Sequence, residues 1–159
     1  MYFFRKQIAI LFIVFACCTL MISCSDSRAI QCTNFTEIVT KGNTLIDIKK
    51  DSNDAGTTKN LAKDLNQIAK QLDALRITDT TLKEIRGLSV KAFRQIGQAL
   101  GNIAKALEAG NKAYTSIKGR EQIKTAQVDI IRAGQQANQA ADNQDALTGK
   151  LIKYCQSPS

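Results

Sequence analysis

Several residue types that build catalytic and metal sites are missing or scarce in this chain. Its 159 residues include no histidine, no tryptophan, one proline and two methionines, Met1 and Met21. Without histidine, a single chain cannot form a histidine-based catalytic triad, a histidine-ligated zinc site or a histidine-ligated haem. Both methionines lie in an N-terminal segment that we expect to be removed, so the mature chain also lacks a thioether ligand. We therefore expect no cofactor and no metal.

Residues 1–23 are typical of an export signal. Arg5 and Lys6 form a short positive segment, and residues 8–22 follow as fifteen residues without a charge. A membrane-spanning helix needs about 20 apolar residues, whereas the apolar core of a secretory signal has about 7 to 15. The length of the run therefore favours a signal peptide over a membrane span.

The apolar run ends in the motif Met-Ile-Ser-Cys at residues 21–24, which resembles a bacterial lipobox. In such a box a small residue precedes a cysteine that is acylated and becomes the new N-terminus; leucine is usual where this chain has methionine. We predict Cys24 as the lipidation site and residues 24–31 as a polar tether. Three alternatives stay open: a second box that ends at Cys17, ordinary signal cleavage after Ser25, and an uncleaved anchor.

The remaining cysteines support export in a second way. If Cys17 and Cys18 leave with the signal and Cys24 carries lipid, only Cys32 and Cys155 remain, one at each end of the mature chain. In an oxidising compartment such a pair predicts one disulfide. The alternative is two unrelated buried thiols.

Beyond the signal, apolar residues recur at helical spacing and no segment alternates as a strand does. Four helices are predicted, at residues 33–49, 57–75, 81–110 and 118–154. Thr33 or Asn34 is a suitable N-cap for the first helix. Thr81 and Glu84 have the spacing of a capping box, and Gly110 is a suitable C-cap for the same helix.

The second, third and last predicted helices carry seams at alternating spacings of three and four, as in helices that pack side by side. The second seam is Leu61, Leu65, Ile68, Leu72 and Leu75. The third is Leu82, Ile85, Ser89, Ala92, Ile96, Ala99, Ile103 and Ala106. The last is Ile123, Ala126, Ile130, Ala133, Ala137, Ala140, Gln144, Leu147, Leu151 and Tyr154.

These seams predict an all-α fold, an antiparallel up-down-up-down four-helix bundle over residues 32–155 with residues 156–159 as a tail. In this topology the first helix starts at the end of the bundle where the last helix finishes. The fold would therefore bring Cys32 and Cys155 together, in agreement with the disulfide that the cysteine count predicts.

No residue pattern in the chain indicates catalysis, and we expect no enzyme. The pair Gly97 and Gly101 forms a G-x-x-x-G motif, but charged and amide neighbours exclude a membrane helix, and the motif lacks the lysine and hydroxyl of a phosphate-binding loop. We expect these glycines to allow close packing against the alanines of the last helix, or simply to weaken their own helix.

The chain is basic, with 22 lysines and arginines against 14 acidic residues. Removal of Arg5 and Lys6 leaves 20 against 14, a net charge of +6. Export argues against nucleic acid as the partner. The only local concentration of basic residues lies within residues 112–124, which favours either a solvated face or contact with anionic lipid headgroups or cell-wall polymer.

Several short motifs resemble a family of small exported helical proteins of cyanobacteria, which are lipoprotein-like and have no known activity. The motifs are Asp64-Leu65-Asn66, Leu72-Asp73-Ala74-Leu75, Ile77-Thr78-Asp79-x-x-Leu82-Lys83, Gly119-Arg120, Ala133-Gly134-x-x-Ala137-Asn138-x-Ala140 and Tyr154-Cys155. The resemblance implies a bacterial envelope protein and transfers no site residues.

These observations predict a non-enzymatic, membrane-tethered lipoprotein of the cell envelope that acts as an interaction or scaffold module. It would face the periplasm or the exterior, held by lipid on Cys24, and meet an envelope protein or an anionic polymer through the loops at its free end. The alternative is a soluble secreted binder or inhibitor built on the same bundle.

Overall fold

The chain folds into four helices and no strand over the residues that the computed structural model describes, which are 28–49, 54–113 and 116–157. The helices are α2 (Arg28–Lys49), α3 (Ala55–Ala74), α4 (Thr80–Asn111) and α5 (Ile117–Gln156). The predicted all-α class is confirmed. The predicted signal and Cys24 lie outside the described residues.

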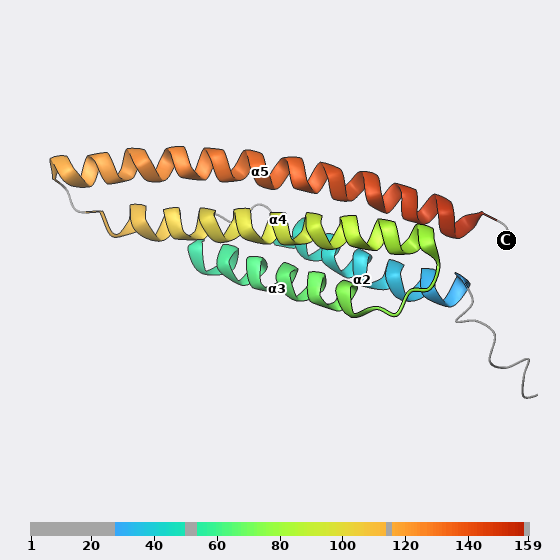
Figure 1. The fold of residues 1–159 in the computed structure, drawn as a ribbon. Helices are drawn as coiled ribbons and strands as arrows, with labels where there is room; N and C mark the ends of the chain where they lie inside the picture. The colour runs from blue at the N-terminus through green and yellow to red at the C-terminus, as the bar shows by residue number, and fades with distance from the viewer. Residues whose placement is uncertain (1–27, 50–53, 114–115, 158–159) are drawn as a thin grey trace, which may run out of the picture.

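The helices run up, down, up and down along one long axis, as Figure 1 shows. α4 packs against α3 on one side and α5 on the other, and α2 closes the bundle against α3 and α5. Within the described residues, α3 and α5 lie diagonally across the bundle, and no Cα atom of one comes within 8 Å of a Cα atom of the other. The 40 residues of α5 span about 60 Å at 1.5 Å per residue, whereas α2 has 22 residues and α3 has 20. The start of α5 therefore lies beyond the ends of α2 and α3 (Figure 1).

The core lies where all four helices overlap. Phe35 of α2, Leu65 of α3 and Phe93 of α4 are completely buried there. Phe93 lies over Gly42 of α2 so closely that a Cβ at Gly42 would be 2.6 Å from two atoms of the Phe93 ring. Only glycine therefore allows α2 to approach α4 at this point.

The predicted seams are largely confirmed. Leu61, Leu65, Ile68 and Leu72 of α3 are buried, as are all the seam positions of α4 except the half-buried Ile103. α4 also buries a second stripe that the heptad pattern did not contain, because α4 has a neighbour on two sides; its members are Val90, Phe93, Gly97 and Ala104. Ile123 was placed in the core of the last helix and this was wrong, since it is 39% exposed.

The start of α2 and both caps of α4 differ from the predicted ones, and the other helix ends lie within two residues of their predicted positions. α2 begins at Arg28 and not near Thr33, so the last residues of the predicted tether are helical. The cap of α4 is Asp79, whose carboxylate accepts a hydrogen bond from the Leu82 N–H at 2.9 Å, in place of the predicted Thr81 capping box. α4 also continues through Gly110 to Asn111 and is capped by Lys112 in a right-handed conformation.

The G-x-x-x-G motif packs on a different neighbour from the one expected. A Cβ at Gly97 would lie 2.9 Å from the Asn66 side chain and 3.1 Å from the Ala62 carbonyl, both on α3. Gly101 has no heavy atom within 4 Å of its Cβ position among the described residues. The expected contact with the alanines of the last helix is therefore wrong, because Gly97 belongs to the second buried stripe of α4.

Candidate functional site

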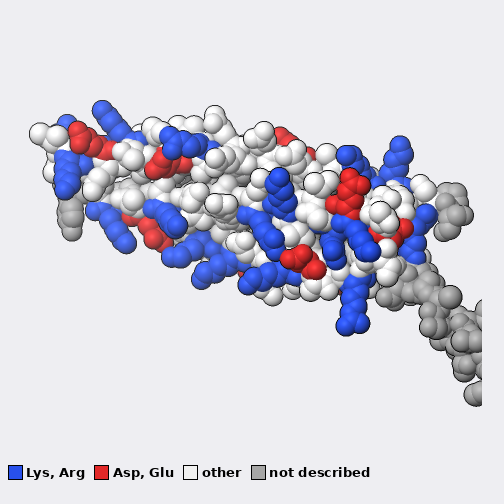
Figure 2. Space-filling view, viewed as in Figure 1, with Lys and Arg blue, Asp and Glu red and all other residues white. Residues whose placement is uncertain are grey.

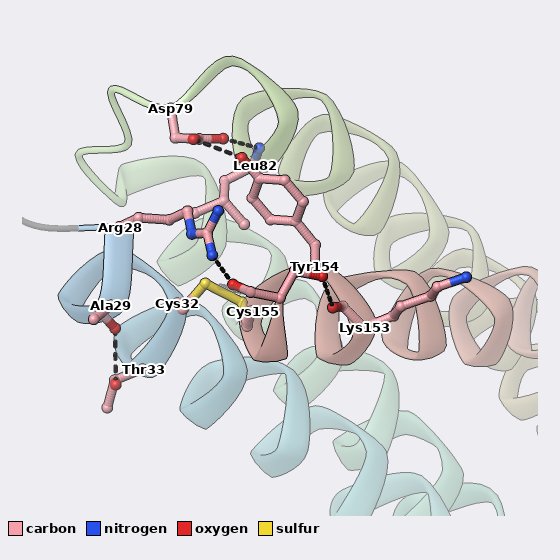
Figure 3. Close-up of a disulfide and its surroundings, with 10 residues drawn as sticks. Arg28, Ala29, Cys32, Thr33, Asp79, Leu82, Lys153, Tyr154 and Cys155 are labelled. Atoms are coloured by element: carbon pink, nitrogen blue, oxygen red, sulfur yellow. Dashed lines mark hydrogen bonds between the residues drawn. A yellow bond between two sulfur atoms is a disulfide. The ribbon is translucent and has the colours of Figure 1, made fainter. Parts of the chain in front are cut away.

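One end of the bundle is closed by a disulfide between Cys32 of α2 and Cys155 of α5. The predicted pairing is confirmed, with 5.7 Å between the two Cα atoms and 123 residues between them in sequence. Figure 3 shows that side chains from the start of α2, the start of α4 and the end of α5 gather beside it. This end also carries the N-terminal end of the described chain.

Three side chains beside the disulfide form a connected group. The Arg28 guanidinium lies 5.0 Å from the centroid of the Tyr154 ring, a cation–π contact, and donates a hydrogen bond to the Ser157 carbonyl. The Tyr154 hydroxyl donates to Asp79 at 2.8 Å. The group therefore joins α2, the cap of α4 and the end of α5 in addition to the covalent bond (Figure 3).

Hydrogen bonds hold the pKa of the Asp79 carboxyl below its ordinary value of 3.8. The largest cause is the backbone N–H of Leu82, and the Tyr154 hydroxyl and the charge of Arg28 act in the same direction. Partial burial opposes them. Asp79 thus stays ionised in the arrangement that caps α4.

Gln31 joins the first turn of α2 to the α3–α4 connection. Its carbonyl oxygen accepts hydrogen bonds from the backbone N–H groups of Thr78 at 2.8 Å and Asp79 at 3.2 Å, and its amide donates to the Thr78 hydroxyl at 2.9 Å. Gln31 is buried, although the sequence placed it in a solvated tether. These bonds explain why the helix begins before Cys32.

Comparison with protein-family models, curated proteins and solved structures gives no match for this chain. Among the residues that the structure describes, no group of three or more histidine, cysteine, aspartate or glutamate side chains is placed to hold a metal ion. None of the described helices is both long enough and apolar enough to cross a membrane.

The opposite end of the bundle is the tip of the α4–α5 hairpin, where the predicted concentration of basic residues is found. Lys112 caps α4, and Lys118, Arg120 and Lys124 lie in the first turns of α5. None of these four side chains forms an ion pair with another described residue. Figure 2 shows lysine and arginine side chains along the visible face up to this end.

The charges at the start of α5 oppose the ordinary preference of a helix. The N-terminus of a helix carries partial positive charge and is stabilised by acidic residues. The first turn of α5 has no acidic residue and instead includes Lys118 and Arg120. The Ser116 hydroxyl caps the helix by accepting a hydrogen bond from the Gly119 N–H at 3.0 Å. The start of α5 therefore combines side-chain charge with the positive end of its own dipole, while the negative end of the α4 dipole lies beside it at the same tip.

A groove of about 1040 Å³ lies between α4 and α5 along the hairpin. Lys105, Lys112, Lys118 and Arg132 line its walls together with amide side chains, and Ala106 and Ala133 lie within it. Of these cations, Arg132 pairs with Asp129 at 3.3 Å. Glu121 and Asp129 also line the groove, so basic side chains exceed acidic ones there by two. The groove is open to solvent, a surface that suits anions and not an enclosed pocket.

The tip also exposes aliphatic side chains that the sequence analysis missed. Eight large apolar side chains are exposed in the described part of the chain, and four of them lie between residues 117 and 131 of α5. They are Ile117 at 77%, Ile123 at 39%, Val128 at 53% and Ile131 at 62%. Three of the four lie off the predicted seam, and that departure from the heptad pattern was the signal available in the sequence.

Proposed function

We propose that this protein is a membrane-tethered lipoprotein of the bacterial envelope, held by lipid on Cys24, which acts without catalysis as an interaction module. The observation that carries the proposal is the place where the chain enters the bundle. α2 begins at Arg28, beside the disulfide. Arg28 is the fourth residue after Cys24, and four residue steps reach at most about 14 Å.

A lipid on Cys24 would therefore keep the disulfide end close to the bilayer. The far tip of the α4–α5 hairpin is then the end most accessible to a partner. Its unpaired cations favour an anionic partner, since opposite charge raises the rate of encounter and selects against like-charged surfaces. The described residues thus divide into a cross-linked end for attachment and a charged end for contact.

The Cys24→Ala variant tests this function. We expect it to leave the membrane fraction or to accumulate as an unprocessed precursor, because the acylated residue is missing. Cys17→Ala, which alters the rival lipobox, is the matched control and should leave both processing and membrane association unchanged. Unaltered processing and membrane association of Cys24→Ala would contradict the lipidation of this residue.

The alternative is a soluble secreted binder or inhibitor built on the same bundle, which would carry no lipid on Cys24. The intact mass of the protein isolated from cells separates the two functions. A chain that starts at Cys24 and carries acyl groups supports tethering, whereas an unmodified chain that starts after Ser25 supports secretion.

A further inference from the structure

We propose that the outer face of α5, made of Ile117, Arg120, Lys124, Val128 and Ile131, docks onto a bilayer that contains anionic phospholipid. The proposal rests on the function proposed above only in placing the protein at a membrane. It assigns a partner to the free end of the molecule, where exposed aliphatic and cationic side chains lie together.

The geometry of the helix puts these residues on one face. Ile117, Lys124, Val128 and Ile131 are separated by seven, four and three residues, which are spacings that return to the same side of an α-helix. The side of α5 that packs on α4 is marked by the buried Gly119, Ala126, Ala133 and Ala140. Because each residue turns the helix by about 100°, Ile117 and Gly119 point in nearly opposite directions, and the outer face is directed away from α4.

The chemistry of this face suits the boundary between headgroups and acyl chains. Ile117, Val128 and Ile131 are more than half exposed, and each would lose contact with water on entering the boundary. Arg120 and Lys124 lie between them in sequence and have no ionic partner among the described residues. Long basic side chains can bury their methylene groups while their charges reach phosphate. The surface potential of anionic lipid attracts these charges.

The same observations disfavour two other occupants. A soluble anionic polymer would pair with Arg120 and Lys124 but would leave the three aliphatic side chains in water. A second copy of this chain, packed face to face on α5, would bring the cations of both copies together, with only Glu121 of opposite sign nearby. A bilayer with anionic headgroups accommodates both the aliphatic and the basic residues.

The absence of tryptophan from the chain makes a direct test possible. We would prepare the full chain with Ile131→Trp, reconstitute it with vesicles of zwitterionic phospholipid alone or mixed with anionic phospholipid, and record tryptophan emission. We expect a shift to shorter wavelength and protection from acrylamide in the anionic vesicles only. The control is Ile48→Trp on α2, where the native isoleucine is 75% exposed. Its emission should be the same in both vesicles.

Charge neutralisation measures the contribution of the cations. Arg120→Gln and Lys124→Gln, each added to Ile131→Trp, should lower the equilibrium constant for insertion about fivefold apiece, as expected for one basic side chain at an anionic surface. Added salt should also reduce the insertion, because it screens exposed charges. Lys63→Gln on α3, which lies diagonally across the bundle from α5, is the matched charge control and should change nothing.

Several results would overturn the proposal. The first is no shift of the tryptophan emission in anionic vesicles, and the second is an equal shift for Ile48→Trp. The third is a shift that grows with protein density whatever the lipid charge. The fourth is protection from acrylamide by soluble dextran sulfate but not by vesicles. The third result would indicate pairing of two copies, and the fourth a polymer. Flotation with zwitterionic vesicles tests tethering separately. A lipid anchor binds a bilayer without anionic lipid, whereas docking of the outer face of α5 requires anionic lipid.

Discussion

Breaking the Cys32–Cys155 disulfide should lower the melting temperature by about 18 °C and leave the helices formed. The bond joins residues 123 apart in sequence, and on the chain-entropy relation a loop of this length stabilises the folded state by about 5 kcal/mol. The unfolding entropy of a domain of about 130 residues is about 0.27 kcal/mol per kelvin. The ratio of these two quantities gives the expected shift.

Thermal melts followed by far-UV circular dichroism check this expectation. The oxidised protein, the same protein reduced with dithiothreitol, and Cys155→Ser are compared. Reduction removes the covalent bond and keeps both side chains, so the reduced protein and Cys155→Ser should melt close together. Dithiothreitol added to Cys155→Ser is the control and should have no effect. Non-reducing peptide mapping establishes whether the bond is present in the starting material.

Three results would contradict this expectation. A shift below about 5 °C would mean that the cross-link does little to restrict the unfolded chain. Loss of most of the helical signal at low temperature after reduction would mean that the packing of Phe35, Leu65 and Phe93 does not hold the bundle by itself. Recovery of both cysteines as free thiols from freshly harvested material would show that the bond does not form in the cell.

Two further predictions concern single positions. Gly42→Ala should destabilise the fold by about 1–3 kcal/mol, because its Cβ would lie 2.6 Å from the Phe93 ring. Gly101→Ala should stabilise the fold by about 0.5–1 kcal/mol, because alanine is the better helix former and the position has open space for its Cβ. Chemical denaturation measures both changes. Asp79 has a pKa below 3.8 in the folded state, so its contribution is complete above pH 3.8 and is lost as the pH falls through the lowered pKa. Lowering the pH should therefore reduce the free energy of unfolding less in Asp79→Asn than in the native protein, because asparagine can still cap the helix but does not titrate. An equal loss of stability in the two proteins would contradict this.

The sequence was sufficient for the parts of the fold that depend on periodic burial. Leu61, Leu65 and Leu72 follow the heptad because α3 presents one side to the core. The heptad could not predict the second buried stripe of α4, because a second neighbour is a property of the packed bundle. Gln31 was missed for a related reason: its hydrogen bonds reach Thr78 and Asp79 across the bundle, so its burial has no local signal.

The candidate sites were predictable to different degrees. The cysteine pair followed from counting cysteines and from the topology, and the basic concentration near Lys118 followed from composition. The exposed aliphatic residues of the outer face were not predicted from the sequence. Ile123 was assigned to the core because it continues the seam. The start of α5, however, has only α4 beside it (Figure 1), so fewer sides of this part of the helix are covered. An apolar seam that continues along a helix predicts burial only where neighbouring helices cover that side of it.

The buried side of α5 changes in character along its length, and this change accounts for the difference between the two ends of the molecule. Near the disulfide it buries Leu147 and Leu151, and toward the tip it buries Ala126 and Ala133. An alanine removes much less apolar surface from water than a leucine, so each turn near the tip is held less strongly. Local opening requires the least free energy where packing is thinnest. The tip can therefore adjust to a surface while the cross-linked end keeps its shape, as the proposed attachment at one end and the proposed docking at the other would require.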